Sequence, residues 1–390
     1  MSVARGAGEQ SSATDLPEIP VFKPLLEQEE HAAATAALEL GWLGMGSYVG
    51  DFESAIEEVV AADERHAVAL STGHAALHLA LLLAEVGPGD EVITPAFNNI
   101  TDFQAIVAVG AEPVFCDVDP LTLCIDLARA EELVSPRTKV MIATDYACLL
   151  CDHDAVADFA RRHSVRVIHD AAHSFGSRYN GRPIGSFSDL CMFSFDPVKL
   201  ITSIDGGALI VRSEEEVAAL REMRLVGMGQ PSTVMYENRR AWTYDVRRLG
   251  FRYHMANLHA AIGLAQLAKI DRIITSRREA CRALSAGLGP LDGITIPSTD
   301  FEDIAPFLYW IRVPGGRRDS MRDHLRALGI DTGIHWQPGH RFTLFADCRR
   351  GPLDQTDRVA EEILTLPLHS EMEDATIGRI LEGVESGLAA

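Results

Sequence analysis

The sequence predicts an α/β protein in which a large domain with a mostly parallel seven-stranded sheet is followed by a smaller α+β unit. Between residues 65 and 211, short apolar runs alternate with amphipathic stretches. Because these runs are nearly continuously apolar, they are typical of strands buried on both faces of a parallel sheet. The 390 residues also exceed what one core usually supports. We therefore expect a large unit with two covered sheet faces and a second, smaller unit.

Seven strands are expected, at residues 66–71, 91–95, 113–117, 139–144, 165–170, 189–195 and 208–211. Most of them are separated by stretches with helical spacing of apolar residues, at 74–86, 102–109 and 154–163. Strands that alternate with helices in this way are typical of parallel strands joined by crossover connections.

Beyond residue 212 the pattern is mainly helical, with helices expected at 214–225 and over 255–288. Little periodicity is present at 227–250, where we expect an ordered loop. A strand at 307–313, a helix at 318–328 and a terminal helix at 374–388 are expected in the smaller unit. The predicted organisation is a disordered tail at residues 1–18, a large domain at 19–265 and a small C-terminal domain at 266–390.

The composition argues against several classes of partner. The net charge of −21 and the isoelectric point near 5.0 disfavour binding to nucleic acid, whose phosphates attract basic proteins. The longest strongly apolar run, at residues 75–84, is far shorter than the roughly 20 residues that span a bilayer. The N-terminus lacks the basic start and the apolar block of a secretion signal. We expect a cytoplasmic protein without nucleic-acid or membrane partners.

The seven cysteines are odd in number and have no framework spacing, which predicts reduced thiols in the cytosol. Cys148 and Cys151 form a close pair. A redox pair or half of a zinc site are the alternatives to plain packing, but zinc requires a second pair, and the sequence has none at the right spacing. We expect plain packing and no metal site.

Polar residues follow five of the predicted strands. They are the run STGH at residues 71–74 after the first strand, Asn98 and Asn99 after the second, Asp145 after the fourth, Asp170 and His173 after the fifth, and Lys199 beyond the sixth. Ligands of such sheets collect outside the carboxyl ends of the strands. The sequence therefore predicts one cleft that is supplied by five strand ends.

Lys199 is the residue in this cleft whose surroundings indicate a carbonyl-reactive amine. A lysine that bonds an aldehyde must spend part of its time unprotonated. This requires an apolar surface that excludes water and enough space for the long side chain to move. The apolar run at residues 190–195 precedes it, and Gly206 and Gly207 then turn the chain into a second strand. The alternative is an ordinary surface lysine in a loop. The other residues of the predicted cleft are needed to distinguish a reactive lysine from a surface lysine.

Pyridoxal 5'-phosphate (PLP) requires an amine, a carboxylate at its ring nitrogen, a phosphate cradle and a surface against its ring. Asp170, at the end of a strand, is placed to keep the ring nitrogen protonated, or else it caps the following turn. Thr72, Gly73 and His74 open a helix, and helix N-termini favour phosphate. Ser194 adds a hydroxyl to the same phosphate unless the backbone satisfies it. His173 packs on the ring or bonds its hydroxyl, unless it is a core histidine.

Six motifs resemble the DegT/DnrJ/EryC1/StrS family, the nucleotide-sugar aminotransferases of fold-type I. They are GSYVGDFE at residues 46–53, GDEVITP at 89–95, GAEPVFCD at 110–117, IHDAAH at 168–173, FSFDPVK at 193–199 and AAIGLAQ at 260–266. The resemblance extends over nearly the whole chain and implies the fold-type I PLP-dependent transferase fold. It also implies that Lys199 is the internal-aldimine lysine, that Asp170 is the pyridinium partner, and that His173 takes the place of a ring-contacting glutamine.

Several positions depart from the family pattern. His74 stands where a threonine is usual in the phosphate turn, and Asn99 stands where an aromatic residue usually stacks on the ring. Arg252 corresponds to an arginine that relatives contribute to the neighbouring subunit's site. The segment of His335, Trp336 and His340 resembles the family's substrate-contacting segment, with Trp336 in place of tyrosine.

The resemblance implies a homodimer with shared active sites that transfers an amino group, with glutamate as the expected donor, to a keto group of a nucleotide-activated deoxysugar. A related branch that dehydrates deoxysugars carries histidine at the lysine position, so Lys199 favours transamination. Two alternatives remain from the departures. One is a PLP-dependent sugar dehydratase, and the other is a catalytically degenerate, PLP-binding regulatory or scaffold protein.

Overall fold

The structure, a computed structural model, describes residues 17–229 and 232–389. Residues 1–16 of the predicted disordered tail lie outside the described residues. No helix in the described ranges is long and apolar enough to cross a membrane. The predicted domain boundary after residue 265 stays a prediction, and it falls inside helix α9 (Asn257–Leu267).

The large part of the chain is built on a seven-stranded sheet with strand order β1-β9-β8-β5-β4-β2-β3. The strands are β1 (His66–Leu70), β2 (Glu91–Pro95), β3 (Glu112–Cys116), β4 (Thr138–Thr144), β5 (Arg166–Asp170), β8 (Leu190–Ser194) and β9 (Gly207–Val211). Neighbours from β3 to β8 pair in parallel, and β9 is antiparallel to both β8 and β1. All seven predicted strands and the mostly parallel sheet are confirmed.

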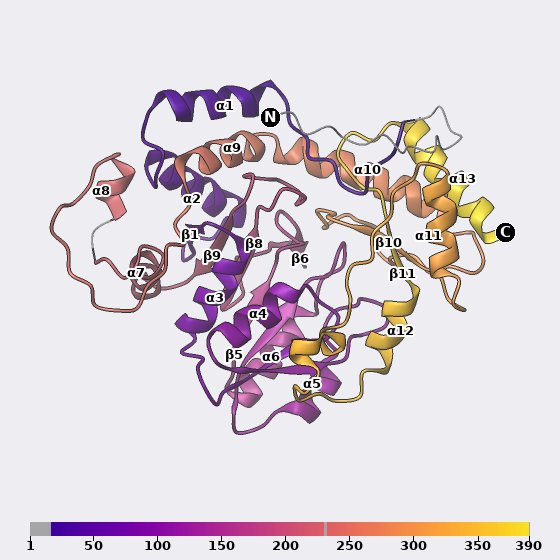
Figure 1. The fold of residues 1–390 in the computed structure, drawn as a ribbon, viewed down its shortest axis with the longest axis horizontal. Helices are drawn as coiled ribbons and strands as arrows, with labels where there is room; N and C mark the ends of the chain where they lie inside the picture. The colour runs from indigo at the N-terminus through magenta and orange to yellow at the C-terminus, as the bar shows by residue number, and fades with distance from the viewer. Residues whose placement is uncertain (1–16, 230–231, 390) are drawn as a thin grey trace, which may run out of the picture.

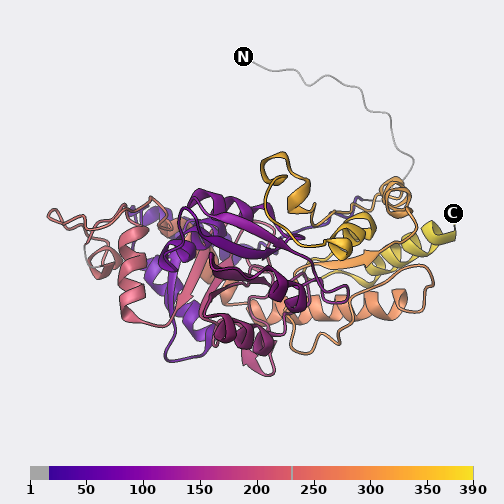
Figure 2. The ribbon, with the colours of Figure 1, turned by 90° about the horizontal axis from the view of Figure 1, so that it is seen from below.

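Successive residues of the strands point into different cores, so both faces of the sheet are covered. On β4, Val140 and Ile142 pack in one apolar cluster, whereas Met141 and Ala143 pack in another. Helices α3 (Gly73–Leu83), α4 (Ile100–Ala108) and α7 (Glu214–Met223) contribute to the first cluster. Helices α2 (Ser47–Val60) and α6 (His153–His163) lie against the other face, as Figures 1 and 2 show.

The predicted helical segment at 255–288 consists of two helices, α9 and α10 (Ile270–Leu288). The chain leaves helical geometry at Lys269, which has φ −120° and ψ 19°. Its ammonium nitrogen lies 3.0 Å from a carboxylate oxygen of Glu27 and 2.8 Å from one of Glu30. These tertiary ion pairs at the break cannot be seen in the local sequence pattern. Helix α10 runs from the sheet toward the C-terminal unit (Figure 1).

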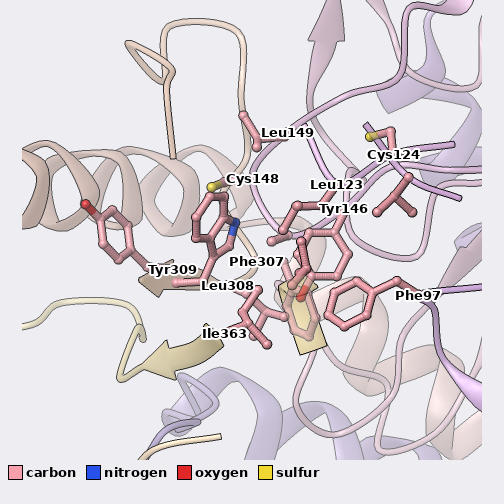
Figure 3. Close-up of a cluster of buried hydrophobic side chains, with 14 of the residues drawn as sticks. Phe97, Leu123, Cys124, Tyr146, Cys148, Leu149, Phe307, Leu308, Tyr309 and Ile363 are labelled. Carbon is pink, nitrogen blue, oxygen red and sulfur yellow. The ribbon is translucent and has the colours of Figure 1, made fainter. Parts of the chain in front are cut away.

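The C-terminal unit holds a two-stranded antiparallel sheet of β10 (Tyr309–Arg312) and β11 (Ile363–Leu366). Its helices are α11 (Arg318–Ala327), α12 (Asp354–Glu362) and α13 (Asp374–Ala389), with short 3-10 turns at Gly339–Arg341 and Thr343–Phe345. An apolar cluster, which includes Phe97, Tyr146, Cys148 and Phe307, joins this unit to the large sheet (Figure 3). Cys148 and Cys151 are both buried free thiols in this core.

Several elements were not predicted. They include α2, α12 and β11, and also α1 (Gln28–Glu39), α5 (Leu127–Leu133), α8 (Ser232–Tyr236) in the loop at 227–250, and the small hairpin of β6 (Arg178–Tyr179) and β7 (Arg182–Pro183). Helix α1 begins with a capping box between Glu27 and Glu30, and it packs along α9. Its apolar residues are mostly alanines, so the sequence gives it only a weak amphipathic pattern.

Candidate active site

A cavity of about 410 Å³ lies at the carboxyl ends of the parallel strands, as the polar strand ends predict. Ten of the twelve predicted site residues line it. They are Thr72, Gly73, His74, Asn99, Asp170, His173, Ser194, Lys199, His335 and Trp336. The cavity therefore gathers residues that follow β1 and β2 and residues of β5 and β8, together with residues of the C-terminal unit, whereas Asp145, after β4, does not line it.

Lys199 lies in the turn between β8 and β9, where its backbone N–H donates to the carbonyl of Asp196 at 3.0 Å. Its side-chain nitrogen lies 4.3 Å from the centre of the Phe307 ring. Burial lowers the pKa of Lys199 to about 8, against the opposing influence of Asp170, Asp196 and Asp102. An amine with such a pKa is unprotonated far more often than a surface lysine, as a carbonyl-reactive amine requires.

Asp170 ends β5, and its side-chain Oδ1 accepts the backbone N–H of Ala172 at 3.0 Å. The residue is 4% exposed. Burial raises the pKa of Asp170 to about 6, while the Ala172 N–H and Lys199 act in the opposite direction. A carboxylate in such a dry position pairs strongly with any cation that enters the cavity.

Behind Asp170 lies a buried hydrogen-bond network around Asp145. The Asp145 carboxylate lies 2.7 Å from Nε2 of His169 and 3.0 Å from Nε2 of His153, and it accepts the Ser174 hydroxyl at 2.6 Å. The two histidines hold the pKa of Asp145 well below its usual value although burial opposes them. The backbone N–H of Asp145 donates to the Asp170 carbonyl at 3.1 Å. The network thus fixes the strand end that carries Asp170.

The N-terminus of α3 and Ser194 form a narrow cradle on one side of the cavity. Thr72 caps α3 by accepting the backbone N–H of Ala75 at 2.9 Å. A Cβ atom at Gly73 would lie 2.9 Å from Cβ and 3.0 Å from Oγ of Ser194, so glycine is required for this close approach. The next residue, His74, has its pKa lowered by burial and is therefore mostly neutral at pH 7.

Aromatic rings form another wall. Nδ1 of His173 accepts the backbone N–H of Ala147 at 3.1 Å, which leaves the proton of the neutral ring on Nε2. The His173 ring centre lies 4.6 Å from that of Phe307 and 6.3 Å from that of Trp336, and the planes of His173 and Trp336 are 27° apart. Burial keeps the pKa of His173 well below its usual value and lowers the pKa of His335 to about 4. This wall presents neutral rings to a ligand.

Two predicted site residues lie outside the cavity. Nε2 of His340 lies 3.2 Å from the carboxylate of Asp357, so it belongs to a polar contact of the C-terminal unit and does not line the cavity. Arg252 is exposed and lines a different cavity of about 740 Å³, together with Trp42 and Trp242. It therefore does not reach the site of its own chain.

Asn99 lines the cavity, but its side chain caps α4 by accepting the backbone N–H of Thr101 at 3.0 Å. Phe97 and Phe103, the aromatic residues nearest to Asn99 in the sequence, pack in apolar cores. The aromatic surfaces come from Phe307 and Trp336, and Phe22 also lines the cavity.

Asp102, Phe22 and Phe307 also line the cavity but were not predicted as site residues. Phe22 and Phe307 come from chain segments that reach the cavity only through tertiary packing, and their local sequence gives no signal. Asp102 closely follows Asn98 and Asn99, which were predicted at this strand end, and an acidic residue in an otherwise apolar segment was the available signal.

The chemistry of this cavity fits PLP. Lys199 would supply the amine for the aldehyde, Asp170 would supply the carboxylate for the ring nitrogen, and the Gly73 cradle with Ser194 would hold the phosphate. The three are the parts that PLP requires of a protein, and the absence of a side chain at Gly73 is what keeps the cradle open.

Comparison with known proteins agrees with this geometry. The model of the DegT/DnrJ/EryC1/StrS aminotransferase family matches residues 24–385. The chain is 33% identical to GDP-perosamine synthase of Caulobacter vibrioides over 96% of this chain and all of that protein. It is 32% identical to a UDP-4-amino-4-deoxy-L-arabinose–oxoglutarate aminotransferase of Shewanella sediminis over 94% and 97% of the two chains. The solved aminotransferase TlmJ of Streptoalloteichus hindustanus superposes with a TM-score of 0.88 at 32% identity, over 95% and 99% of the chains.

Proposed function

Because the chain belongs to the DegT/DnrJ/EryC1/StrS aminotransferase family and is a PLP-dependent aminotransferase, we propose that it aminates a keto group of a nucleotide-activated deoxysugar. The observation that carries the proposal is the buried Lys199 amine, which has a lowered pKa and shares one cavity with Asp170 and the Gly73 cradle. Glutamate is the proposed amino donor, in keeping with the oxoglutarate in the name of the Shewanella relative.

Each residue has a proposed task. Bound PLP supplies the aldehyde that carries the amino group and a ring that accepts electrons. Lys199 would hold the aldehyde end and, with its amine free, would move a proton at the substrate carbon that carries the amino group. Asp170 keeps a proton on the ring nitrogen, and Ser194 with the α3 N-terminus binds the phosphate. The Nε2–H of neutral His173 is a donor for an oxygen in the cavity.

The proposed sugar site lies at the aromatic wall of the C-terminal unit. Trp336 and His335 border the cavity, and the pKa of His335 is low enough to keep its ring neutral. Flat neutral rings favour stacking on a sugar or base face and add little charge of their own. This arrangement supports a substrate that presents a flat, partly apolar sugar or base face.

We also propose that the protein is a cytoplasmic homodimer whose partner subunit completes the site. Arg252 lies outside the cavity of its own chain, in the larger cavity with Trp42 and Trp242. Apolar side chains nearby are unusually exposed, with Trp242 at 88%, Leu249 at 76% and Leu43 at 54%. Large exposed apolar residues in one region indicate a protein interface, and the guanidinium of Arg252 has the geometry to bind a phosphate across it.

The cofactor assignment is tested with PLP added to the purified protein. We expect an absorption band of lysine-bound PLP, which borohydride fixes covalently on Lys199 and on none of the three other lysines, Lys23, Lys139 and Lys269. Lys199→Ala abolishes the band, while Lys139→Ala, a surface control, retains it. A band that survives Lys199→Ala contradicts the assignment.

The reaction is tested by adding glutamate to the PLP-loaded protein. We expect the band to convert to that of the amine form of the cofactor with release of one oxoglutarate, and a nucleotide-activated 4-keto-deoxysugar to restore it. A PLP-binding scaffold would show no conversion. A dehydratase would release water from the sugar without net transfer of nitrogen, and either result would refute the proposed function.

A further inference from the structure

Asp102 is a buried carboxyl group in the cavity for which the site described so far has no task. It lies in the first turn of α4, is 1% exposed and lines the cavity together with Asp170. Its Oδ2 accepts the Asn98 side-chain N–H at 2.6 Å and faces the Thr144 hydroxyl at 3.5 Å. Its Oδ1 is also buried but has no hydrogen-bond partner among the described residues. An oxygen buried in this way is costly unless a partner satisfies it.

Asp170 lies next to this carboxyl group, because its register partner on β4 is Thr144, whose hydroxyl faces Asp102, and the two carboxyl groups act on each other's pKa. Two carboxylates so close in a dry site cannot both be ionised, so the pair retains a proton. Burial and the charge of Asp170 raise the pKa of Asp102 well above its usual value. Asp170 accepts the backbone N–H of Ala172, and the charge of Lys199 lowers its pKa. Both interactions favour the ionised form of Asp170.

The other charged groups around the pair also favour a protonated Asp102 and an ionised Asp170. Lys199 acts on both carboxyl groups, Asp145 acts on Asp170 as a like charge, and Asp196 acts on Lys199. The Asp145 charge is itself compensated by His153 and His169. Lys199 is the only lysine or arginine among the described residues that line the cavity, so its charge favours one ionised carboxylate, and Asp170 is the one with the backbone donor.

We propose that Asp102 is a neutral carboxylic acid whose Oδ1–H donates to the Asp170 carboxylate, so that Asp170 is held in place and ionised for the ring nitrogen of PLP. Asp102 is thus a positioning residue, which acts on the cofactor through Asp170. The inference rests on the PLP site proposed above, but its first test uses the protein without PLP.

The direct test is a pH titration of the backbone-assigned side-chain carboxyl carbons of Asp102 and Asp170 by ¹³C NMR, in PLP-free protein. At pH 7 we expect the protonated chemical shift at Asp102 and the ionised shift at Asp170. In Asp102→Asn, which adds no charge and keeps an N–H donor, the Asp170 titration stays near its wild-type position. In Asp102→Leu, which has no donor, the Asp170 titration moves to higher pH. Asp205→Asn, a control whose carboxyl group lines the same cavity, leaves the Asp170 titration unchanged.

The second test is the affinity for PLP. Asp102→Asn retains an N–H donor for Asp170, so its Kd for PLP stays within about threefold of wild type. Asp102→Leu has similar volume but no donor, and its Kd rises about tenfold or more, as expected for a lost hydrogen bond to a charged group. An ionised Asp102 at pH 7, or a folded Asp102→Leu protein with wild-type affinity, overturns the proposal. If the glutamate half-reaction fails, the NMR titration still decides the protonation of Asp102, so the two failures are distinguishable.

Discussion

Replacement of Gly73 by alanine tests the phosphate cradle more sharply than any other single change. The new Cβ would lie 2.9 Å from Cβ of Ser194, 3.0 Å from its Oγ and 3.2 Å from Cε of Met192. Ser194 belongs to β8, which is hydrogen-bonded within the sheet, so the serine cannot easily move away. The α3 N-terminus and Ser194 are therefore forced apart, or Ser194 rotates its hydroxyl out of the cradle.

The effect on folding is expected to be small and the effect on PLP large. Overpacking costs about 1–3 kcal/mol, and alanine returns about 1 kcal/mol over glycine in a helix. The net loss of folding free energy is thus about 0–2 kcal/mol. A lost hydrogen bond to the phosphate dianion costs about 1.5–3 kcal/mol, which corresponds to a Kd for PLP that is about 10–150 times higher.

The assay is a fluorescence titration with PLP, paired with urea unfolding of the PLP-free protein. Gly378→Ala is the matched control, because a Cβ at Gly378 in α13 meets nothing within 4 Å. Its affinity for PLP is expected to equal that of wild type. A Gly73→Ala protein that is folded and binds PLP within threefold of wild type would refute the assignment of the cradle.

Three further predictions follow from charge and burial. The pKa of Lys199 is lowered to about 8, so the unprotonated fraction of its amine rises with pH around that value. The rate of PLP attachment is therefore expected to increase through about pH 8 and then to level off. A rate that is constant from pH 7 to 9 contradicts this prediction. Arg224→Leu leaves buried Glu53 without its 2.5 Å partner and lowers the free energy of unfolding by about 3–5 kcal/mol in urea, whereas exposed Arg239→Leu changes it by less than about 0.5 kcal/mol. Trp242→Ser weakens the proposed dimer at least about tenfold by sedimentation equilibrium, in keeping with the loss of a large interface aromatic, and unchanged association would place the interface elsewhere.

The strands could be predicted from the sequence because each lies in a continuous apolar run, and both faces of the sheet are buried. The reversed direction of β9 and the break at Lys269 could not be predicted, because neither depends on local residue type. β9 runs antiparallel because the chain turns back directly after Lys199 and hydrogen-bonds with β8 and β1. The break at Lys269 coincides with ion pairs to residues more than 200 positions away along the chain.

The cavity residues could be predicted where a strand end delivers them, as at Asp170, Ser194 and the α3 N-terminus. They could not be predicted where docking of the C-terminal unit delivers them, as at Phe307. Asn99 differs from both cases, because its side chain caps α4 and asparagine is a favoured N-cap residue. The sequence therefore contained a local explanation for Asn99, independent of any contact with the cofactor ring.

The folding free energy that is lost by burying ionisable groups in this cavity favours a catalytic protein over a scaffold without catalytic activity. Burying an amine and two carboxyl groups in one cavity shifts the pKa values of Lys199, Asp170 and Asp102 away from their usual values, and each shift costs folding free energy. Replacing such groups with apolar residues often leaves a protein equally or more stable. A scaffold would gain from that replacement, because the interface proposed above, near the exposed Trp242 and Leu249, does not include these three groups. Retaining all three ionisable groups is an advantage only if the amine reacts and a carboxylate holds the proton of the ring, as in the proposed aminotransferase.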